Sequence, residues 1–435
     1  MNIVVIGTGY VGLVSGACFS EFGFNVTCID KDKEKIEQLE KGVIPIYEPG
    51  LDVLVERNHA AGRLSFATTL DGYAENADAV FIAVGTPTRR GDGHADLSYV
   101  FAAASEVAEK LRDYTVIVTK STVPVGTGRQ VEAVLREANP KADFDVVSNP
   151  EFLREGSAIN DFMRPDRVVV GAESERAIER MRALYRPLYL IEKPVLFTSL
   201  ETAELIKYAA NAFLAVKISY INQMADLCEA VGADVHDVAK GMGLDNRIGS
   251  KFLHPGPGYG GSCFPKDTLA LVKTAELFDV PVSIVSDVVA YNAVRKSAMA
   301  ARVIRACGDN VSGKNIAVLG LSFKPETDDM RESPALDIIS TLCKSGANIT
   351  AYDPAAIEEA RPLLPESVVY VASAQDCLKG ADCAVVVTEW NEFRALTPHI
   401  FQSLMAGPIL VDLRNIYEPN VMREHGIDYT SIGRK

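Results

Sequence analysis

The sequence predicts an α/β protein with two doubly wound domains joined by a long central helix. A strand, a turn, a helix and a strand follow one another over residues 2–30, and the same order returns over residues 314–353. Between them, residues 199–230 contain neither Pro nor Gly and have helical periodicity. We therefore expect a first doubly wound domain over residues 1–198, a central helical and dimerisation domain over 199–300, and a second doubly wound domain over 301–435.

The first predicted strand, residues 2–6, is rich in β-branched residues and ends at a glycine-rich turn. A helical pattern follows, and a second strand ends at Asp30, 18 residues after Gly12. This spacing is typical of a Rossmann-like unit, in which glycines admit a pyrophosphate and the acidic side chain bonds the ribose 2′-hydroxyl. Because Asp30 would repel a 2′-phosphate, NAD is predicted over NADP. The turn reads Gly7-Thr8-Gly9-Tyr10-Val11-Gly12.

Polar side chains follow the next predicted strands, at residues 79–84, 115–120 and 144–148. Ligands of open α/β sheets bind at the carboxyl ends of the strands, so these side chains are expected to border one crevice. Each of them could instead cap a helix or stabilise a turn. The residues concerned are Thr86, Thr122, Glu151 and Glu155.

Lys207 and Asn211 are four residues apart in the predicted central helix and therefore share one of its faces. A lysine on a helix is usually solvated, but here Ile206, Ala210 and Phe213 surround the pair. These apolar neighbours indicate partial burial, which favours a functional role.

A second glycine-rich segment, residues 258–267, contains Cys263 followed by Pro265, Lys266 and Asp267. Glycines let the backbone approach a ligand closely. A neighbouring cation favours the nucleophilic thiolate form of a cysteine, and a carboxylate can orient water or accept a proton. The alternative is a glycine-rich turn with an incidental cysteine.

The second Rossmann-like pattern lacks the dinucleotide glycines, since its turn reads Gly320-Leu321-Ser322-Phe323-Lys324-Pro325. This degenerate turn predicts a different nucleotide ligand, with Lys324 serving a phosphate.

Composition and charge narrow the possible functions. A net charge of −14 disfavours non-specific binding to nucleic acid or anionic membranes, but it allows an anionic small ligand. No apolar run approaches the ~20 residues of a membrane span, and no basic region precedes the first apolar stretch, so no signal peptide is predicted. The eight Cys are scattered without a C-x-x-C pair, which favours a reducing cytoplasm, and no His/Cys cluster has metal-ligand spacing.

Six motifs, in order and spacing, closely resemble those of the nucleotide-sugar 6-dehydrogenase family. The resemblance covers essentially the whole chain and implies oxidation of a sugar primary alcohol to a carboxylate, with two NAD per sugar. It further implies UDP-glucose as the substrate. The length, the lack of Pro and Gly and the central position of residues 199–230 predict a homodimer or a larger assembly with this helix at the shared seam. The motifs lie at residues 7–12, 121–127, 149–156, 204–211, 258–267 and 322–334.

The resemblance also implies catalytic roles. Cys263 would add to the aldehyde to form a thiohemiacetal, whose oxidation gives a thioester. Lys207 and Asn211 would stabilise oxyanions, and Asp267 and Thr122 would position water. Glu155 and Asp267 are both candidates for the hydrolytic base, and the sequence leaves that choice open.

Binding residues follow from the same resemblance. The implied NAD contacts are Gly7, Gly9, Tyr10, Val11, Gly12, Asp30, Lys35, Thr86, Thr122, Glu155, Lys266 and Arg331. The implied substrate contacts are Glu151, Phe152, Leu153, Arg154, Glu155, Lys207, Asn211, Phe252, Leu253, His254, Pro255, Gly256, Gly260 and Lys324. Arg247 matches an arginine that reaches the partner subunit's substrate.

Three other functions remain open. Dehydrogenases of GDP-mannose share the Cys-x-Pro-Lys-Asp motif, although residues 323–327 resemble the UDP-glucose group more closely. Dehydrogenases of UDP-N-acetyl-hexosamines usually lack the Lys-Asp pair. The third alternative is an NAD-binding redox sensor without turnover. Such a protein would not need to keep Lys207, Asn211, Cys263 and Asp267 together, so their joint presence disfavours it.

Overall fold

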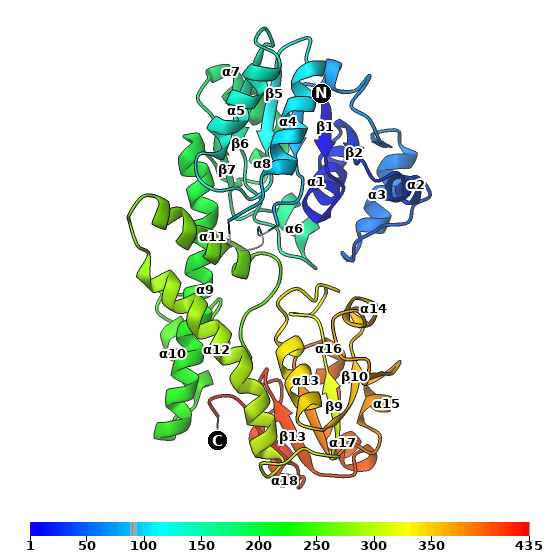
Figure 1. The fold of residues 1–435 in the computed structure, drawn as a ribbon, viewed down its shortest axis with the longest axis vertical. Coiled ribbons are helices and arrows are strands. Elements are labelled where there is room, and N and C mark those ends of the chain that lie inside the picture. Colours follow the sequence, from blue (N-terminus) through cyan, green and yellow to red (C-terminus); the bar gives the residue numbers. More distant parts are fainter. Residues whose placement is uncertain (88, 90–93, 435) are drawn as a thin grey trace. The chain divides into compact units, whose positions relative to one another are not determined.

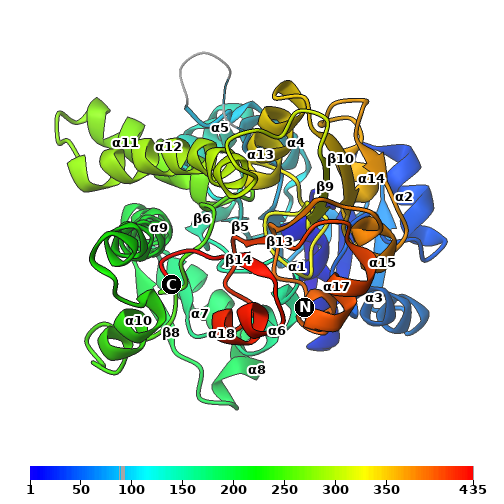
Figure 2. The same cartoon turned by 90° about the horizontal axis from the view of Figure 1, so that it is seen from below.

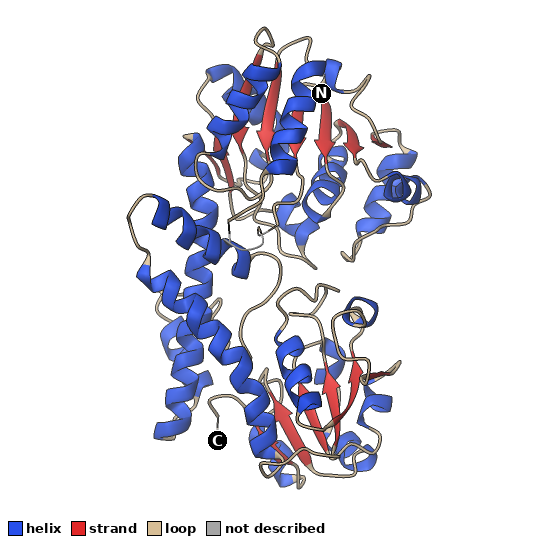
Figure 3. Cartoon of the chain, viewed as in Figure 1, coloured by secondary structure: helices blue, strands red, loops and turns tan. Residues whose placement is uncertain are grey.

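The computed structural model describes residues 1–87, 89 and 94–434 (Figure 1). Two compact units make up this part of the chain. The first holds residues 1–210 with 273–279, and the second holds residues 211–272 with the chain from 280 onward. Each unit contains one sheet flanked by helices (Figure 3).

In the first unit, the described residues form an eight-stranded sheet in the order β3-β2-β1-β4-β5-β6-β7-β8. All neighbouring strands are parallel except β6 and β7, which are antiparallel. The strands are β1 (Asn2–Ile6), β2 (Asn25–Ile29), β3 (Leu64–Ala67), β4 (Ala79–Ile82), β5 (Thr115–Thr119), β6 (Phe144–Ser148), β7 (Val168–Gly171) and β8 (Val195–Thr198).

Both faces of this sheet are buried. Ile3 and Val5 pack in one apolar cluster and Val4 and Ile6 in another, because successive side chains of a strand point to opposite faces. The helices of the unit are α1 (Tyr10–Glu21), α2 (Lys33–Glu40), α3 (Leu51–Ala60), the 3₁₀ turn η1 (Ala74–Asn76), α4 (Ser98–Lys110), α5 (Thr127–Ala138), α6 (Ala158–Met163), α7 (Glu175–Leu184) and α8 (Arg186–Tyr189).

In the second unit, six parallel strands of the described chain have the order β11-β10-β9-β12-β13-β14. Helices α12 and α13 of this unit lie side by side (Figure 1 and Figure 2). The strands are β9 (Asn315–Leu319), β10 (Asn348–Tyr352), β11 (Val369–Tyr370), β12 (Cys383–Val386), β13 (Ile409–Asp412) and β14 (Asp428–Thr430). The helices are α10 (Val235–Gly243), α12 (Ser283–Ala306), α13 (Pro334–Lys344), α14 (Ile357–Ala360), α15 (Ala374–Leu378), α16 (Asn391–Arg394), α17 (Pro398–Leu404) and α18 (Pro419–Glu424). Helix α11 (Phe264–Leu277) begins in the second unit, and its residues from 273 onward belong to the first.

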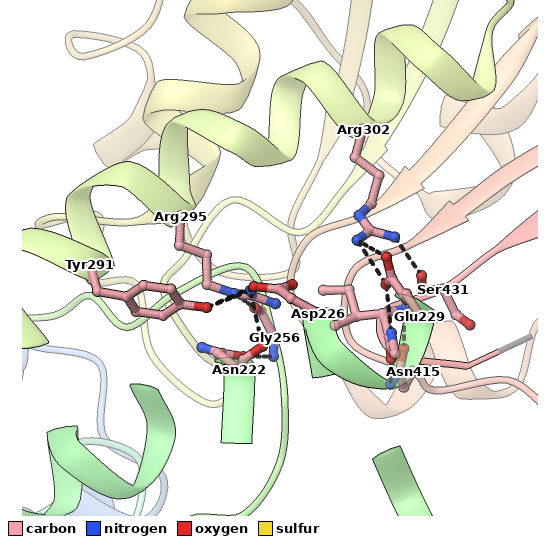
Figure 4. Close-up of polar contacts among 11 residues, drawn as sticks. Asn222, Asp226, Glu229, Gly256, Tyr291, Arg295, Arg302, Asn415 and Ser431 are labelled. Atoms are coloured by element: carbon pink, nitrogen blue, oxygen red, sulfur yellow. Dashed lines mark hydrogen bonds and ion pairs between the residues drawn. The ribbon is translucent and has the colours of Figure 1, made fainter. Parts of the chain in front are cut away.

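The long helix α9 (Leu200–Val231) begins in the first unit and ends in the second. In the second unit its Glu229 accepts bonds from Arg302 of α12 and from the backbone N–H of Gly433, at 2.8 and 2.7 Å (Figure 4). Arg302 also donates to the Ser431 carbonyl at 2.9 Å. These bonds fasten the C-terminal segment to α9 and α12.

The predicted fold class is confirmed, with two doubly wound sheets and a long helix between residues 200 and 231. Several predicted strands are too long by one or two residues, as β4 ends at Ile82 rather than at residue 84. The chain boundaries of the three expected domains stay a prediction. Among the described residues, no helix is both long and apolar enough to cross a membrane.

Glycines of the first turn make a matched pair for a test of stability. A Cβ at Gly12 would lie 1.9 Å from the Gly7 carbonyl oxygen, whereas a Cβ at Gly9 would meet nothing within 4 Å. We expect Gly12→Ala to destabilise the first unit by about 1–3 kcal/mol, because the backbone must shift. Gly9→Ala should lower the thermal midpoint much less, because it loses only the preference for glycine at the N-cap. Equal midpoints for the two variants in a calorimetric scan would contradict this packing account.

Candidate functional site

The glycine-rich turn between β1 and α1 has the shape that a dinucleotide pyrophosphate requires. Gly7 has a φ of +99°, which L side chains rarely adopt, and a Cβ there would lie 2.6 Å from the Ala83 carbonyl oxygen. Gly9 forms the N-cap of α1, so backbone N–H groups without intrahelical partners face outward from this turn. The turn is therefore a positively polarised cradle of backbone donors.

Asp30 follows β2 beside this turn. Its carboxylate accepts bonds from the backbone N–H and the hydroxyl of Thr8, at 2.9 and 2.7 Å, and lies 3.5 Å from the Lys35 ammonium. Burial opposes ionisation of Asp30, but these hydrogen bonds and the Lys35 charge outweigh it and hold the pKa of the carboxyl below its ordinary value. The side chain stays partly exposed, so an anionic acceptor is available to a ribose hydroxyl. The residues present thus fit NAD.

Thr86 and Thr122 follow β4 and β5, which are neighbours in the sheet. The Thr86 hydroxyl donates to the Thr122 carbonyl at 3.0 Å, and Ser121 donates to the Val84 carbonyl at 2.7 Å. The structure therefore brings these two loops together at the carboxyl edge of the sheet, as predicted from strand order.

A buried ion pair joins Glu151, which follows β6, to Lys207 of α9. The Lys207 Nζ lies 2.9 Å from Glu151 Oε1, and the two side chains are 3% and 4% exposed. Burial raises the pKa of Glu151, but the Lys207 charge and hydrogen bond, with a backbone bond from Leu153, outweigh it and lower that pKa. The two predicted residues therefore lie in direct contact as a buried salt bridge.

Lys120 is a second buried lysine at this edge, and sequence reasoning missed it. Its Nζ donates to Asn149 Oδ1 at 3.0 Å and lies 3.3 Å from the Tyr185 hydroxyl, so both acceptors are neutral. Burial lowers the pKa of Lys120 to about 8, with Glu151 opposing and Lys207 adding to the shift. The one sequence feature that could have indicated a role for Lys120 is its position directly after β5.

In the second unit, Asn211 of α9 donates to Asp267 Oδ2 at 2.6 Å, and Lys266 lies 2.7 Å from Asp267 Oδ1. Asp267 is 1% exposed. Cys263 immediately precedes α11, and its carbonyl accepts the Asp267 backbone N–H at 2.8 Å. The partial positive charge of this helix N-terminus stabilises a thiolate.

The glycines before Cys263 pack against the protein itself. A Cβ at Gly260 would lie 2.4 Å from the Glu332 carbonyl oxygen, and one at Gly261 would lie 2.6 Å from the Phe323 ring. We expected these glycines to admit a ligand, but the structure requires them for close contact with the loop that follows β9. A substrate contact at Gly260 stays a prediction.

Residues 252–256 are held between α9 and α12. Asn222 Oδ1 accepts the Gly256 N–H at 2.8 Å, and Arg295 Nε donates to the Gly256 carbonyl at 2.7 Å (Figure 4). Asp226 fixes the Arg295 guanidinium at 3.0 Å. These bonds hold the Gly256 end of the predicted substrate segment, and Phe252 at its other end has a φ of +65°.

Arg414, which sequence reasoning also missed, follows β13 at the carboxyl edge of the second sheet. Its Nη2 donates to the Phe323 carbonyl at 2.9 Å, its Nε lies 3.0 Å from Glu389, and a Cβ on Gly256 would be 3.2 Å from its Nη1. Arg414 therefore lies where the loop bearing Lys324 meets the 252–256 segment. Arg414 and Lys324 both follow strands at the carboxyl edge of the second sheet.

Asp353, the counterpart of Asp30 in the second sheet, is already satisfied. Its carboxylate accepts bonds from the backbone of Leu321 and Ser322 and from the Trp390 indole, at 2.7, 3.0 and 3.1 Å, and it is 1% exposed. A ribose hydroxyl cannot reach it. This agrees with the loss of the dinucleotide glycines at this turn.

The remaining predicted residues have partners of their own. Arg154 pairs with Asp161 at 2.6 Å, Arg331 with Asp329 at 2.8 Å, and Arg247 with Asp245 at 2.5 Å. The Arg247 side chain is 89% exposed. Ligand contacts by these residues, and by Tyr10, Val11, Phe152, Leu153, Glu155, His254 and Pro255, stay predictions. Within the described chain, no cluster of three or more His, Cys, Asp or Glu side chains could hold a metal ion.

Comparison with known proteins gives consistent matches along the chain. Models of the UDP-glucose/GDP-mannose dehydrogenase family match at residues 1–189 (NAD binding domain), 201–294 (central domain) and 317–419 (UDP binding domain). The UDP-glucose 6-dehydrogenase of Rhizobium meliloti is 60% identical, with all of both chains covered.

Two solved structures are similar to the whole chain. A UDP-glucose dehydrogenase from Pyrobaculum islandicum has a TM-score of 0.91 at 38% identity, covering 100% of this chain and 98% of its own. A UDP-D-ManNAc dehydrogenase from Pyrococcus horikoshii has a TM-score of 0.87 at 28% identity, covering 100% and 99%.

The buried Lys120 gives a stability prediction with a definite sign. Between pH 8 and the ordinary lysine pKa of 10.5, the unfolded chain holds a proton that the folded chain has released. The stability of the wild type should therefore rise with pH, relative to that of Lys120→Met, by up to about 3 kcal/mol over this window. Thermal midpoints of both proteins at several pH values between 7 and 10 measure the difference. A difference that stays constant with pH would contradict the assignment.

Proposed function

This chain belongs to the UDP-glucose/GDP-mannose dehydrogenase family, and we propose that it oxidises UDP-glucose to UDP-glucuronate with two molecules of NAD. The observation that carries the proposal is Cys263 at the N-terminus of α11, one helical turn before Asp267, which Asn211 holds. The 60% identity with a UDP-glucose 6-dehydrogenase along the full length supports this choice of sugar.

A thiol is required because one carbon must lose two hydrides. The first oxidation removes a hydride and a proton from the primary alcohol and leaves an aldehyde. The Cys263 thiolate adds to the aldehyde carbon, and the resulting oxyanion takes up a proton to give a thiohemiacetal. Loss of a second hydride and that proton gives a thioester, and water then releases the carboxylate and regenerates the thiol. NAD, when bound, accepts each hydride.

Side chains of this chain stabilise the charges that develop. The Lys207 ammonium, which pairs with Glu151, and the Asn211 amide stabilise oxyanions on the reacting carbon. Asp267 and Thr122 position the hydrolytic water.

Asp267 and Glu155 are the two candidates for the base that activates this water. Slower thioester hydrolysis in Asp267→Asn than in Glu155→Gln would assign that role to Asp267.

Cationic groups at the edge of the second sheet bind the nucleotide part of the substrate. Lys324 and Arg414 lie on loops after β9 and β13, where ligands of doubly wound sheets bind. We assign the diphosphate to these two residues, with Arg414 held in place by Glu389 and the Phe323 carbonyl.

The test of the proposed function is NADH formation with UDP-glucose, GDP-mannose and UDP-N-acetylmannosamine, each supplied separately. UDP-glucose should give the highest kcat/KM, with two NADH for each UDP-glucuronate formed. A preference for either of the other sugar nucleotides would move the chain to another branch of the family. No NADH with any of the three would contradict dehydrogenase activity.

Replacement of the nucleophile should stop the reaction before uronate is released. In Cys263→Ser we expect sustained UDP-glucuronate formation to fall by a factor of at least about 1,000, because a serine hydroxyl has no thiolate-like population near neutral pH. Cys343→Ser, at another partly exposed cysteine, is the control and should retain activity. Near wild-type turnover of Cys263→Ser would show that this residue is not the covalent nucleophile.

We further propose a homodimer with α9 at the shared seam. Within the second unit, α9 exposes Phe213, Tyr220 and Leu227 by 65%, 45% and 51%. Their spacing of seven residues is typical of a helix that packs against another helix.

We also propose a reducing cytoplasm as the location, which the eight free cysteines support.

A charge within this stripe should prevent association. Leu227→Asp is expected to convert the dimer to a monomer by light scattering at micromolar concentration. Val421→Asp, at an exposed apolar residue of α18, is the control and should leave the mass unchanged. A wild-type monomer with full activity would contradict the proposed dimer.

A further inference from the structure

Glu48 is a buried carboxylate that none of the steps above uses. It lies between α2 and α3 and is 7% exposed. Its Oε2 accepts the Gly156 N–H at 2.6 Å, and its Oε1 accepts the Ala158 N–H at 2.7 Å. The Tyr10 hydroxyl donates a short hydrogen bond to Oε2. All four residues belong to the first unit.

These bonds join two segments that serve different ligands. Tyr10 is the first residue of α1 and lies within the glycine-rich turn that fits NAD. Gly156 ends the segment 151–156, which contains Glu151 and Glu155, and its N–H also approaches the Tyr10 hydroxyl at 2.9 Å. One carboxylate therefore fixes both the cofactor turn and the predicted substrate segment.

The bonds of Glu48 to Tyr10, Gly156 and Ala158 should hold the two segments in a fixed position. Hydrogen bonds to an ionised carboxylate are stronger than bonds between neutral groups, and their loss would leave buried donors without acceptors. Burial raises the pKa of Tyr10, and the hydrogen bond and charge of Glu48 raise it further, so the phenol keeps its proton and remains a donor.

A purely structural role would be the capping of α6, whose first N–H groups Glu48 accepts. That role does not require Tyr10. The bond to Tyr10 instead links the capped segment to the first turn of α1. Tyr10→Phe would remove this link and leave the Gly156 and Ala158 bonds to Glu48 in place, so the two roles can be separated.

We propose that Glu48 is a positioning residue that couples the two ligand sites of the first unit, so that a bound dinucleotide strengthens binding of the sugar nucleotide and the reverse. The proposal rests on the function proposed above. Because coupling between two ligands is reciprocal, it can be measured from either ligand.

The experiment measures NADH binding by its fluorescence, with and without UDP-glucose, so that no turnover occurs. The proteins are the wild type, Glu48→Gln, Tyr10→Phe and the double variant. We expect UDP-glucose to tighten NADH binding to the wild type by about fivefold or more, within the usual range for coupled sites. In Glu48→Gln and in Tyr10→Phe this factor should fall below about 2, and the double variant should lose no more than either single one.

Controls separate coupling from stability. Tyr10→Phe should keep a thermal midpoint near that of the wild type, because the α6 cap remains. Ser174→Ala, which removes the N-cap of α7 in the same unit, should lower the midpoint but keep the coupling. Wild-type coupling in Glu48→Gln or in Tyr10→Phe would overturn the proposal, as would a wild type in which UDP-glucose leaves NADH affinity unchanged.

Failure of the proposed function has a different signature. If another sugar nucleotide supports turnover and UDP-glucose does not, the assigned substrate is wrong, and the coupling is then measured with the active sugar nucleotide. The same fall in coupling on Glu48→Gln would still support the role of Glu48.

Discussion

The buried ion pair between Glu151 and Lys207 is the interaction on which the first unit's site depends. A buried ion pair adds little net stability, because the desolvation of both charges offsets much of their attraction. Removal of one partner, however, leaves the other charge buried without a counter-ion and destabilises the protein strongly. The pair fixes α9 to the end of β6. Glu204, three residues before Lys207, does the same by accepting the Gly126 and Gly128 N–H groups at 2.7 and 2.8 Å. Both carboxylates hold the helix against the sheet edge.

The helical repeat then extends this constraint along the chain. Asn211 follows Lys207 by one turn on the same face of α9, and its amide holds Asp267 behind Cys263. One helix thus carries an ammonium that meets a carboxylate of the first unit and an amide that meets a carboxylate of the second. No Gly or Pro interrupts α9 over residues 200–231, which favours a continuous helix through both positions.

Sequence patterns predicted what depends on local order. Runs of apolar residues gave β1, β2, β9 and β10, and glycine spacing located the dinucleotide turn. The strands β3 and β8 were missed because each has four residues and lies at or next to a partly exposed stretch, so neither has a continuous buried pattern. Strand β7, which also has four residues and pairs with β6 in the antiparallel direction, was missed as well.

The partners of the buried charges could not be predicted in this way. Glu48 meets Gly156, 108 residues later, and Arg414 meets the Phe323 carbonyl, 91 residues earlier. Neither residue belongs to a motif that signals its partner. Lys120 is likewise separated from its Tyr185 contact by 65 residues. The packing of helices and loops around each sheet brings these side chains together.

Cys263 is proposed to form a covalent bond with the oxidised sugar, and peptide mass spectrometry after acid quenching detects that bond most directly. The Asp267→Asn variant, in which thioester hydrolysis should be slow, is mixed with UDP-glucose and NAD and quenched within seconds. We expect the peptide containing Cys263 to gain the mass of the UDP-glucuronyl group and to lose it again on treatment with hydroxylamine. An adduct on another residue, or uronate formation with no adduct at any quench time, would contradict it.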